Sequence, residues 1–106
     1  MIEKPNLNYL HEISGGDKEF QTKLLQIVKV ELPQEIKSYS IFLKEENFKL
    51  AAETVHKIKH KISILGLEKS YQLAIDYEED LKKNNVKLQD KFENILNSMI
   101  SFINEV

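Results

Sequence analysis

Residues 56–67 read HKIKHKISILGL, and this stretch determines how the rest of the chain is interpreted. Apolar residues recur here and just before it at steps of three, four and three, at Val55, Ile58, Ile62 and Leu65. At about 100° per residue they form one stripe along an α-helix, as in the core of a helical bundle. The segment also holds two histidines and three lysines within residues 56–61, which a core-filling helix does not need.

The polar residues of this helix lie on the side away from the apolar stripe. On a helical wheel His56 falls about 140° and His60 about 180° from the centre of the stripe. Glu53 lies with them, and Lys59 and Ser63 lie at the margin of the same face. The wheel therefore predicts that both histidines point to solvent.

Two apolar residues border this polar face. Ile64 falls roughly 140° from the stripe, and with Ala52 it gives the face an apolar margin of the kind found in docking surfaces. For Ile64, contact with a partner and burial under a neighbouring helix remain equal alternatives. The predicted partner-docking residues are Ala52, Glu53, His60, Ser63 and Ile64.

The remaining segments also have helical periodicity, and none alternates with period two. Pro33 is expected to interrupt the chain, because proline lacks a backbone donor and disfavours helix at the residue before it. The predicted helices cover residues 18–31, 34–45, 48–66, 68–83 and 88–104, after a short segment at 6–13. The expected core aromatics are Phe20, Tyr39, Phe42, Phe92 and Phe102. Short loops favour antiparallel neighbours. The prediction is one all-α domain, residues 1–106: an antiparallel up-down-up-down four-helix bundle with one or two additional short N-terminal helices.

Composition excludes several classes of function. The chain is 42% hydrophobic and 30% charged, with a net charge of −2, so it lacks the basic excess of a nucleic-acid binder. It has no cysteine, which rules out disulfides and thiolate chemistry. No apolar run resembles a signal peptide or a membrane span. We expect a cytoplasmic protein that contacts neither nucleic acid nor membrane.

An exposed imidazole beside a lysine suits phosphoryl chemistry. An unperturbed imidazole is largely neutral at cytoplasmic pH, so it is available as a nucleophile. Lys59, one turn after His56, supplies a positive charge that attracts a phosphoryl group. His56 and His60 also have the spacing of paired metal ligands, but Lys57 and Lys59 between them repel a cation. No metal site is predicted.

The spacing of His56, Lys59 and Gly66, H-x-x-K-x(6)-G, resembles the signature of histidine-containing phosphotransfer (HPt) domains. Tyr77-Glu78 stands where that family tends to place Leu-Glu. The likeness extends over about residues 6–106 and includes Leu10, Ile13, Gly15-Gly16-Asp17, Phe20, Leu24, Leu25 and Pro33.

The resemblance implies a phosphoryl carrier that is not an enzyme in the usual sense and has no ATP site of its own. His56 would be the phosphoryl acceptor, and Lys59 would stabilise the phosphate. The implied partners are a response-regulator receiver domain, which would bring the Mg²⁺, and a hybrid sensor histidine kinase. The carrier itself needs no cofactor and is expected to be a monomer. Glu78 is expected near the acceptor, because its helix should pack beside that of His56.

The chain departs from the family pattern next to the acceptor. His60 stands where the family has glycine, small residues are replaced by Lys61 and Ile62, and Ser70 replaces an aliphatic residue. His60 would narrow the choice of partner, add a hydrogen bond to phosphate, or mark a lost activity. The alternatives are therefore a degenerate HPt-like bundle that docks receiver domains without phosphotransfer, and a bundle of unrelated function.

Overall fold

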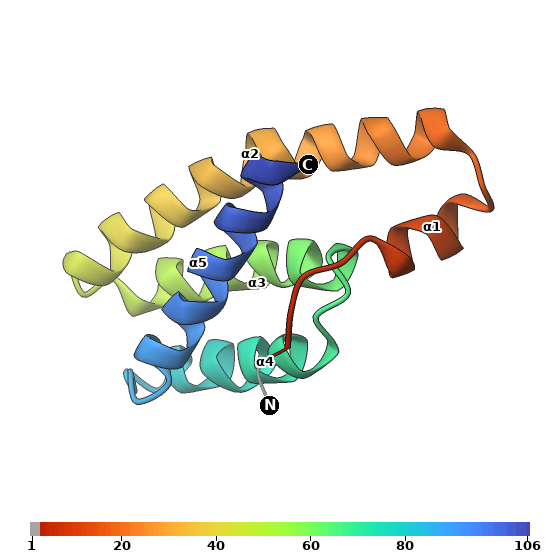
Figure 1. Ribbon diagram of the computed structural model, residues 1–106. Helices are drawn as coiled ribbons and strands as arrows, with labels where there is room; N and C mark the ends of the chain where they lie inside the picture. The colour runs from red at the N-terminus through yellow and green to blue at the C-terminus, as the bar shows by residue number, and fades with distance from the viewer. Residues whose placement is uncertain (1–2) are drawn as a thin grey trace.

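The computed structural model describes residues 3–106 (Figure 1). Within this range the chain forms five α-helices and no strand, which confirms the all-α prediction. The helices are α1 (Asn8–Ser14), α2 (Lys18–Lys44), α3 (Phe48–Ile64), α4 (Glu68–Lys82) and α5 (Gln89–Glu105).

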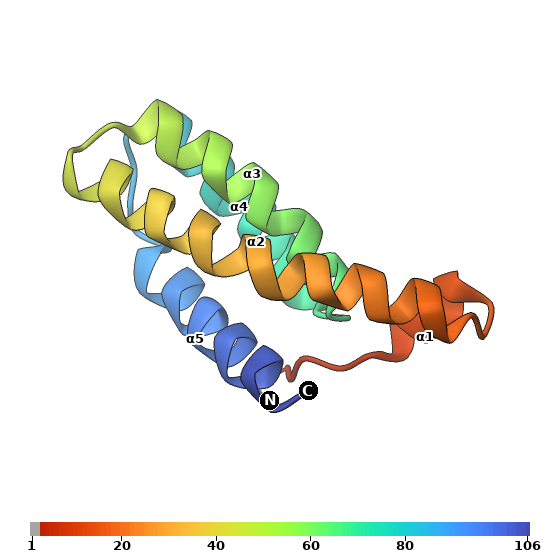
Figure 2. The same cartoon turned by 90° about the horizontal axis from the view of Figure 1, so that it is seen from above.

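Helix α3 holds the central place in the packing. It lies between α2 and α4 and packs most extensively against these two, while α5 packs against α2 and α4 (Figures 1 and 2). The predicted stripe of Val55, Ile58, Ile62 and Leu65 is fully buried in one core cluster with side chains of α2, α4 and α5. The apolar periodicity of α3 is thus explained by contact with its neighbours on one side.

Helix α2 corrects the prediction of two helices separated at Pro33. It runs unbroken from Lys18 to Lys44, with Pro33 inside it. A proline inside a helix removes one backbone hydrogen bond and costs about 3 kcal/mol. On either side of it Leu32 and Tyr39 are buried in the core, and this packing outweighs the loss. The predicted cap is confirmed, since the Asp17 carboxylate accepts a hydrogen bond from the Phe20 amide.

Phe20 was expected in the core, and this prediction is wrong. Phe20 is 44% exposed, and Ile27, two turns further along the same face of α2, is also exposed. In Figures 1 and 2, α1 and the first turns of α2 extend past the ends of α4 and α5. Helical spacing identifies an apolar face, but it does not tell whether a neighbouring helix is long enough to cover that face.

Three aromatic rings join α2, α4 and α5 in the core. The rings of Tyr39, Tyr77 and Phe92 lie 5.0 to 6.2 Å apart, centroid to centroid. The Tyr39 and Tyr77 hydroxyls are 2.7 Å apart, and the Tyr39 hydroxyl also donates to Glu93 at 3.1 Å. Burial raises the pKa of both phenols, that of Tyr77 to about 12. The hydrogen bonds satisfy the buried hydroxyls and fix the rotation of α4, so that Glu78, the residue after Tyr77, turns toward α3.

The segment before α1 ties the ends of two helices together. The Asn6 amide donates to the carbonyl of Leu65 at 2.9 Å. The Glu3 carboxylate accepts from the amides of Lys69 and Ser70, both at 2.9 Å, and so caps the first turn of α4. Gly66, predicted to end the α3 segment, adopts φ +74° between these two helices.

We expect Gly66→Ala to lower the free energy of unfolding by about 1–2 kcal/mol for the left-handed backbone alone. A β-carbon at Gly66 would also lie 2.6 Å from Asn6 Oδ1, so the Asn6 side chain must shift as well. Urea unfolding measures the change. Gly15→Ala is the matched control, because Gly15 has φ +60° and nothing lies within 4 Å of the added carbon. An equal loss in both variants would show that the contact with Asn6 contributes nothing.

Candidate functional site

The outward face of α3 carries the histidines, as the wheel predicts. The His56 side chain is 53% exposed, and Glu53 and His60 are also exposed. The same helix buries Ile58 and Ile62 on the opposite side. His56 is therefore placed on a rigid element, with its backbone held by the core and its ring accessible.

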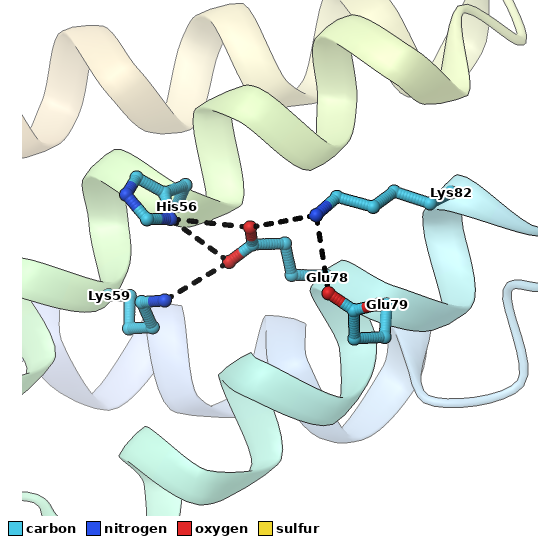
Figure 3. Close-up of polar contacts among 5 residues, drawn as sticks. All are labelled: His56, Lys59, Glu78, Glu79 and Lys82. Atoms are coloured by element: carbon cyan, nitrogen blue, oxygen red, sulfur yellow. Dashed lines mark hydrogen bonds and ion pairs between the residues drawn. The ribbon is translucent and has the colours of Figure 1, made fainter.

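The Glu78 carboxylate of α4 lies beside the His56 ring, at its Nδ1 edge, and is contacted by His56, Lys59 and Lys82 (Figure 3). His56 Nδ1 is 3.2 Å from Oε2 and 3.3 Å from Oε1. Lys59 Nζ donates to Oε1 at 3.2 Å, and Lys82 Nζ lies 3.6 Å from Oε2. Lys82 also binds Glu79 at 3.2 Å. The expectation that Glu78 lies near His56 is confirmed, and Lys82 is an addition to the site.

The charge on Glu78 determines which nitrogen of His56 is free. Burial raises the pKa of Glu78, but hydrogen bonds from Lys59 and His56 outweigh it and hold the pKa below the ordinary value of 4.5. The carboxylate is therefore ionised at neutral pH and can only accept hydrogen bonds. His56 must donate through Nδ1–H, which leaves the lone pair of the neutral ring on Nε2. The contact thus selects one tautomer and one nucleophilic atom.

Lys59 is less accessible to solvent than its predicted position at the margin of the polar face implies. Its side chain is only 12% exposed, and its ammonium group lies 5.8 Å from the centre of the Tyr71 ring. Together with the bond to Glu78, this contact holds the amine on the Nδ1 side of His56. Lys59 is therefore placed to balance the charge of Glu78 in the unmodified protein.

The predicted docking residues differ in accessibility. Glu53 and His60 are exposed, and Ser63 and Ile64 are partly buried. Ile64 packs in part against the core cluster, so burial accounts for much of its side chain. Ala52 is buried, with 2% of its surface exposed, although it lines a hollow beside His56 that also includes Lys49, Glu53, Lys57, Glu78 and Lys82. Ala52 can thus contact a partner only at the floor of this hollow.

Lys61 has a structural role that the sequence analysis missed. Its ammonium group lies 2.8 Å from Glu31 Oε1 and 2.9 Å from Glu35 Oε2, across the contact between α3 and α2. Burial lowers the pKa of Lys61, but the two carboxylates outweigh it and raise the pKa above its ordinary value. The sequence did contain one indication of this contact: Glu31 and Glu35 are four residues apart, so both lie on one face of a helix and can bind the same lysine. Of the lysines in the 56–61 stretch, Lys57 is the exposed one.

His60 lies edge-on to His56. The ring centroids are 5.3 Å apart and the ring planes are perpendicular. No group of three or more potential metal ligands occurs in the part of the chain that the structure describes. Within that part, no helix has the length and apolar composition needed to cross a membrane.

Comparison with known proteins gives no match to any protein-family model, curated protein or solved structure.

Proposed function

We propose that this chain is a histidine phosphotransfer protein that relays a phosphoryl group between receiver-domain aspartates in two-component signalling. The observation that carries the proposal is the hydrogen bond from His56 Nδ1 to the ionised Glu78, because it leaves Nε2 as the free nucleophile on an exposed helix face. The resemblance of residues 56–66 to the HPt signature supports the same acceptor.

The proposal includes the arrangement of the helices. Helices α2 to α5 would form an antiparallel up-down-up-down four-helix bundle, with α1 as the additional short N-terminal helix. The packing of α3 against α2 and α4, and of α5 against the same two helices, supports this arrangement. The carrier would act in the cytoplasm as a monomer. A hybrid sensor histidine kinase and a response regulator would be its partners.

The proposed reaction is a single displacement at phosphorus. The lone pair of His56 Nε2 attacks the phosphorus of a receiver's aspartyl phosphate, the N–P bond forms, and the bond from phosphorus to the aspartate oxygen breaks. The receiver's carboxylate leaves with that electron pair, and its own Mg²⁺ stabilises the transferring group. His56 keeps its Nδ1 proton, so its ring becomes positively charged. Glu78 stabilises that charge at 3.2 Å.

The lysines around Glu78 give the site a net positive charge. Four lysines lie around the site (Lys49, Lys57, Lys59 and Lys82) against three glutamates (Glu53, Glu78 and Glu79), which leaves one positive charge in excess. A bound phosphoryl group, which carries nearly two negative charges, would therefore enter a favourable field. Lys82 is half exposed and adds its charge to this field while it stays paired with Glu78 and Glu79.

Glu78→Gln is expected to slow phosphoryl acceptance by about 10- to 100-fold, as for other hydrogen-bond partners that orient a functional histidine. Lys59 only donates and is the nearer lysine, so it favours the amide oxygen at the position of Oε1 and leaves the amide N–H₂ at the position of Oε2, 3.2 Å from His56 Nδ1. His56 must then accept through Nδ1, which places the proton on Nε2 and removes the nucleophilic lone pair. The rate of label transfer from a phosphorylated receiver measures the effect. Glu79→Gln is the control, because Glu79 contacts Lys82 but not His56; equal slowing in both would contradict this role for Glu78.

The test of the proposed function is incubation with receiver domains phosphorylated on aspartate. The protein should acquire an acid-labile, base-stable phosphate, and mass spectrometry should locate it on His56. Label on another residue would refute the site.

One observation favours a second candidate, a bundle that docks receivers without accepting phosphate: the His60 ring occupies space beside His56. Stable receiver binding without any label on the wild-type protein would establish this alternative.

A further inference from the structure

His60 contacts the proposed acceptor but is itself uncommitted. Its ring lies against His56 at 5.3 Å between centroids, one helical turn further along the exposed face of α3. Among residues 3–106, no hydrogen bond or ion pair to its side chain is present. The two imidazoles therefore have different surroundings: Glu78 fixes the tautomer of His56, whereas both nitrogens of His60 are available to a ligand.

Two other basic groups near His56, the ammonium groups of Lys59 and Lys82, are already paired with carboxylates of α4. Lys59 is held by Glu78 and by the face of Tyr71, and Lys82 is shared between Glu78 and Glu79. These contacts all lie around Nδ1, whereas a phosphoryl group on His56 would sit on Nε2 at the other edge of the ring. A group that binds the phosphoryl oxygens there must come from the exposed side of α3, where Lys57 and His60 lie, and of these two His60 has its ring against that of His56.

We propose that His60 is a phosphate-binding residue that, in its imidazolium form, donates an N–H to an oxygen of the phosphoryl group on His56. This inference rests on the proposed function, since it requires His56 to be the acceptor. An imidazolium has two N–H donors and a positive charge, and a phosphoryl group has three acceptor oxygens and nearly two negative charges. Side chains four residues apart on a helix are close enough for this contact, which the ring distance of 5.3 Å supports.

The consequence is that protonation and phosphorylation favour each other. Because the phosphoryl group stabilises the charged ring, the titration midpoint of His60 should rise by about one pH unit when His56 is phosphorylated. By linkage, one unit makes the phosphorylated state about tenfold more favourable at pH values below both midpoints than above them.

Other charged groups surround the pair, and the test must separate them from His60. His56 is also an imidazole, so the comparison is between the wild type and His60→Gln and not between two pH values of one protein. The neighbouring groups are Glu53, Lys57 and Lys59 on α3 and Tyr71, Glu78 and Lys82 on α4; these residue types do not ordinarily titrate between pH 5 and 8. Lys57, three residues before His60, is an exposed positive charge and serves as the matched control.

The experiment phosphorylates the intact protein with phosphoramidate and follows both histidines by NMR. In this reaction the N–P bond of phosphoramidate breaks as the bond to His56 Nε2 forms, and ammonia leaves. The titration midpoint of His60, read from the chemical shifts of its ring protons, should rise by about one pH unit in the phosphorylated protein. The ³¹P resonance should follow this second titration in the wild type and in Lys57→Gln, but not in His60→Gln. His60→Lys should place a positive charge beside the phosphoryl group again, but its ³¹P resonance should show no second titration.

Three results would overturn the inference, and the first of them leaves the proposed function standing. If His56 is phosphorylated but the His60 midpoint does not move and His60→Gln leaves the ³¹P titration unchanged, the phosphate-binding role is wrong and the carrier function stands. If phosphoramidate labels His60 in place of His56, both the acceptor and the role of His60 are wrong. If neither histidine is labelled, the inference and the proposed acceptor fail together.

Discussion

The His56→Gln protein is expected to take up no phosphoryl group from a phosphorylated receiver, although it folds as the wild type does. An amide nitrogen is not a nucleophile toward phosphorus, so the acceptor is lost completely. The glutamine side chain can still donate a hydrogen bond to Glu78, and the wild-type ring is half exposed, so stability should change by no more than about 0.5 kcal/mol. Label transfer and urea unfolding measure the two quantities.

Two histidine variants serve as controls for this result. His11 lies on α1 and makes no contact with the site, and its side chain is exposed, so His11→Gln should accept label at the wild-type rate. His60→Gln should still be labelled, because His60 is not the acceptor. Transfer to His56→Gln at the wild-type rate would show that the phosphoryl group goes to another residue. A large loss of stability in that variant would show that His56 has a structural role.

The directions of the apolar stripe and of His56 on α3 were predictable from the sequence. The spacing of Val55, Ile58, Ile62 and Leu65 depends only on helical periodicity, and all four side chains are buried. The exposure of the His56 side chain follows from this burial, because His56 lies on the opposite side of the same helix. Such a prediction needs no knowledge of the neighbouring helices, and this is why it succeeded.

The contacts between helices were less predictable. A helical wheel gives the face of a residue but not the residue that meets it, so the burial of Lys61 against Glu31 and Glu35 was missed. The break expected at Pro33 relied on a local preference of about 3 kcal/mol, which the burial of Leu32 and its neighbours exceeds. Local rules failed where packing against another helix determined the outcome.

The link between core and site runs through two adjacent residues of α4. Tyr77 is fully buried and is hydrogen-bonded to Tyr39 of α2, while Glu78 meets His56 of α3. Because successive residues on a helix differ by about 100°, fixing Tyr77 in the core also fixes the direction of Glu78. The position of the proposed acceptor thus depends on packing among α2, α3 and α4, and not on the signature residues alone.

Ile58→Ala is expected to lower the free energy of unfolding by about 2–5 kcal/mol, a large part of the about 5–15 kcal/mol of a typical domain. Ile58 is fully buried between α3 and its neighbours, so truncation leaves a cavity. Urea unfolding should show a lower midpoint with an unchanged slope.

The position of Ile58 on α3 also predicts what this substitution leaves intact. Ile58→Val should cost only about 0.5–1.5 kcal/mol, and Ile64→Ala, at a partly buried position, should cost less than Ile58→Ala. Because Ile58 points away from His56, phosphoryl acceptance by the folded fraction of Ile58→Ala should match that of the wild type. A smaller loss for Ile58→Ala than for Ile64→Ala would mean that the stripe does not form the centre of the core. A folded Ile58→Ala protein that no longer accepts phosphate would instead show that core packing at Ile58 controls the position of His56.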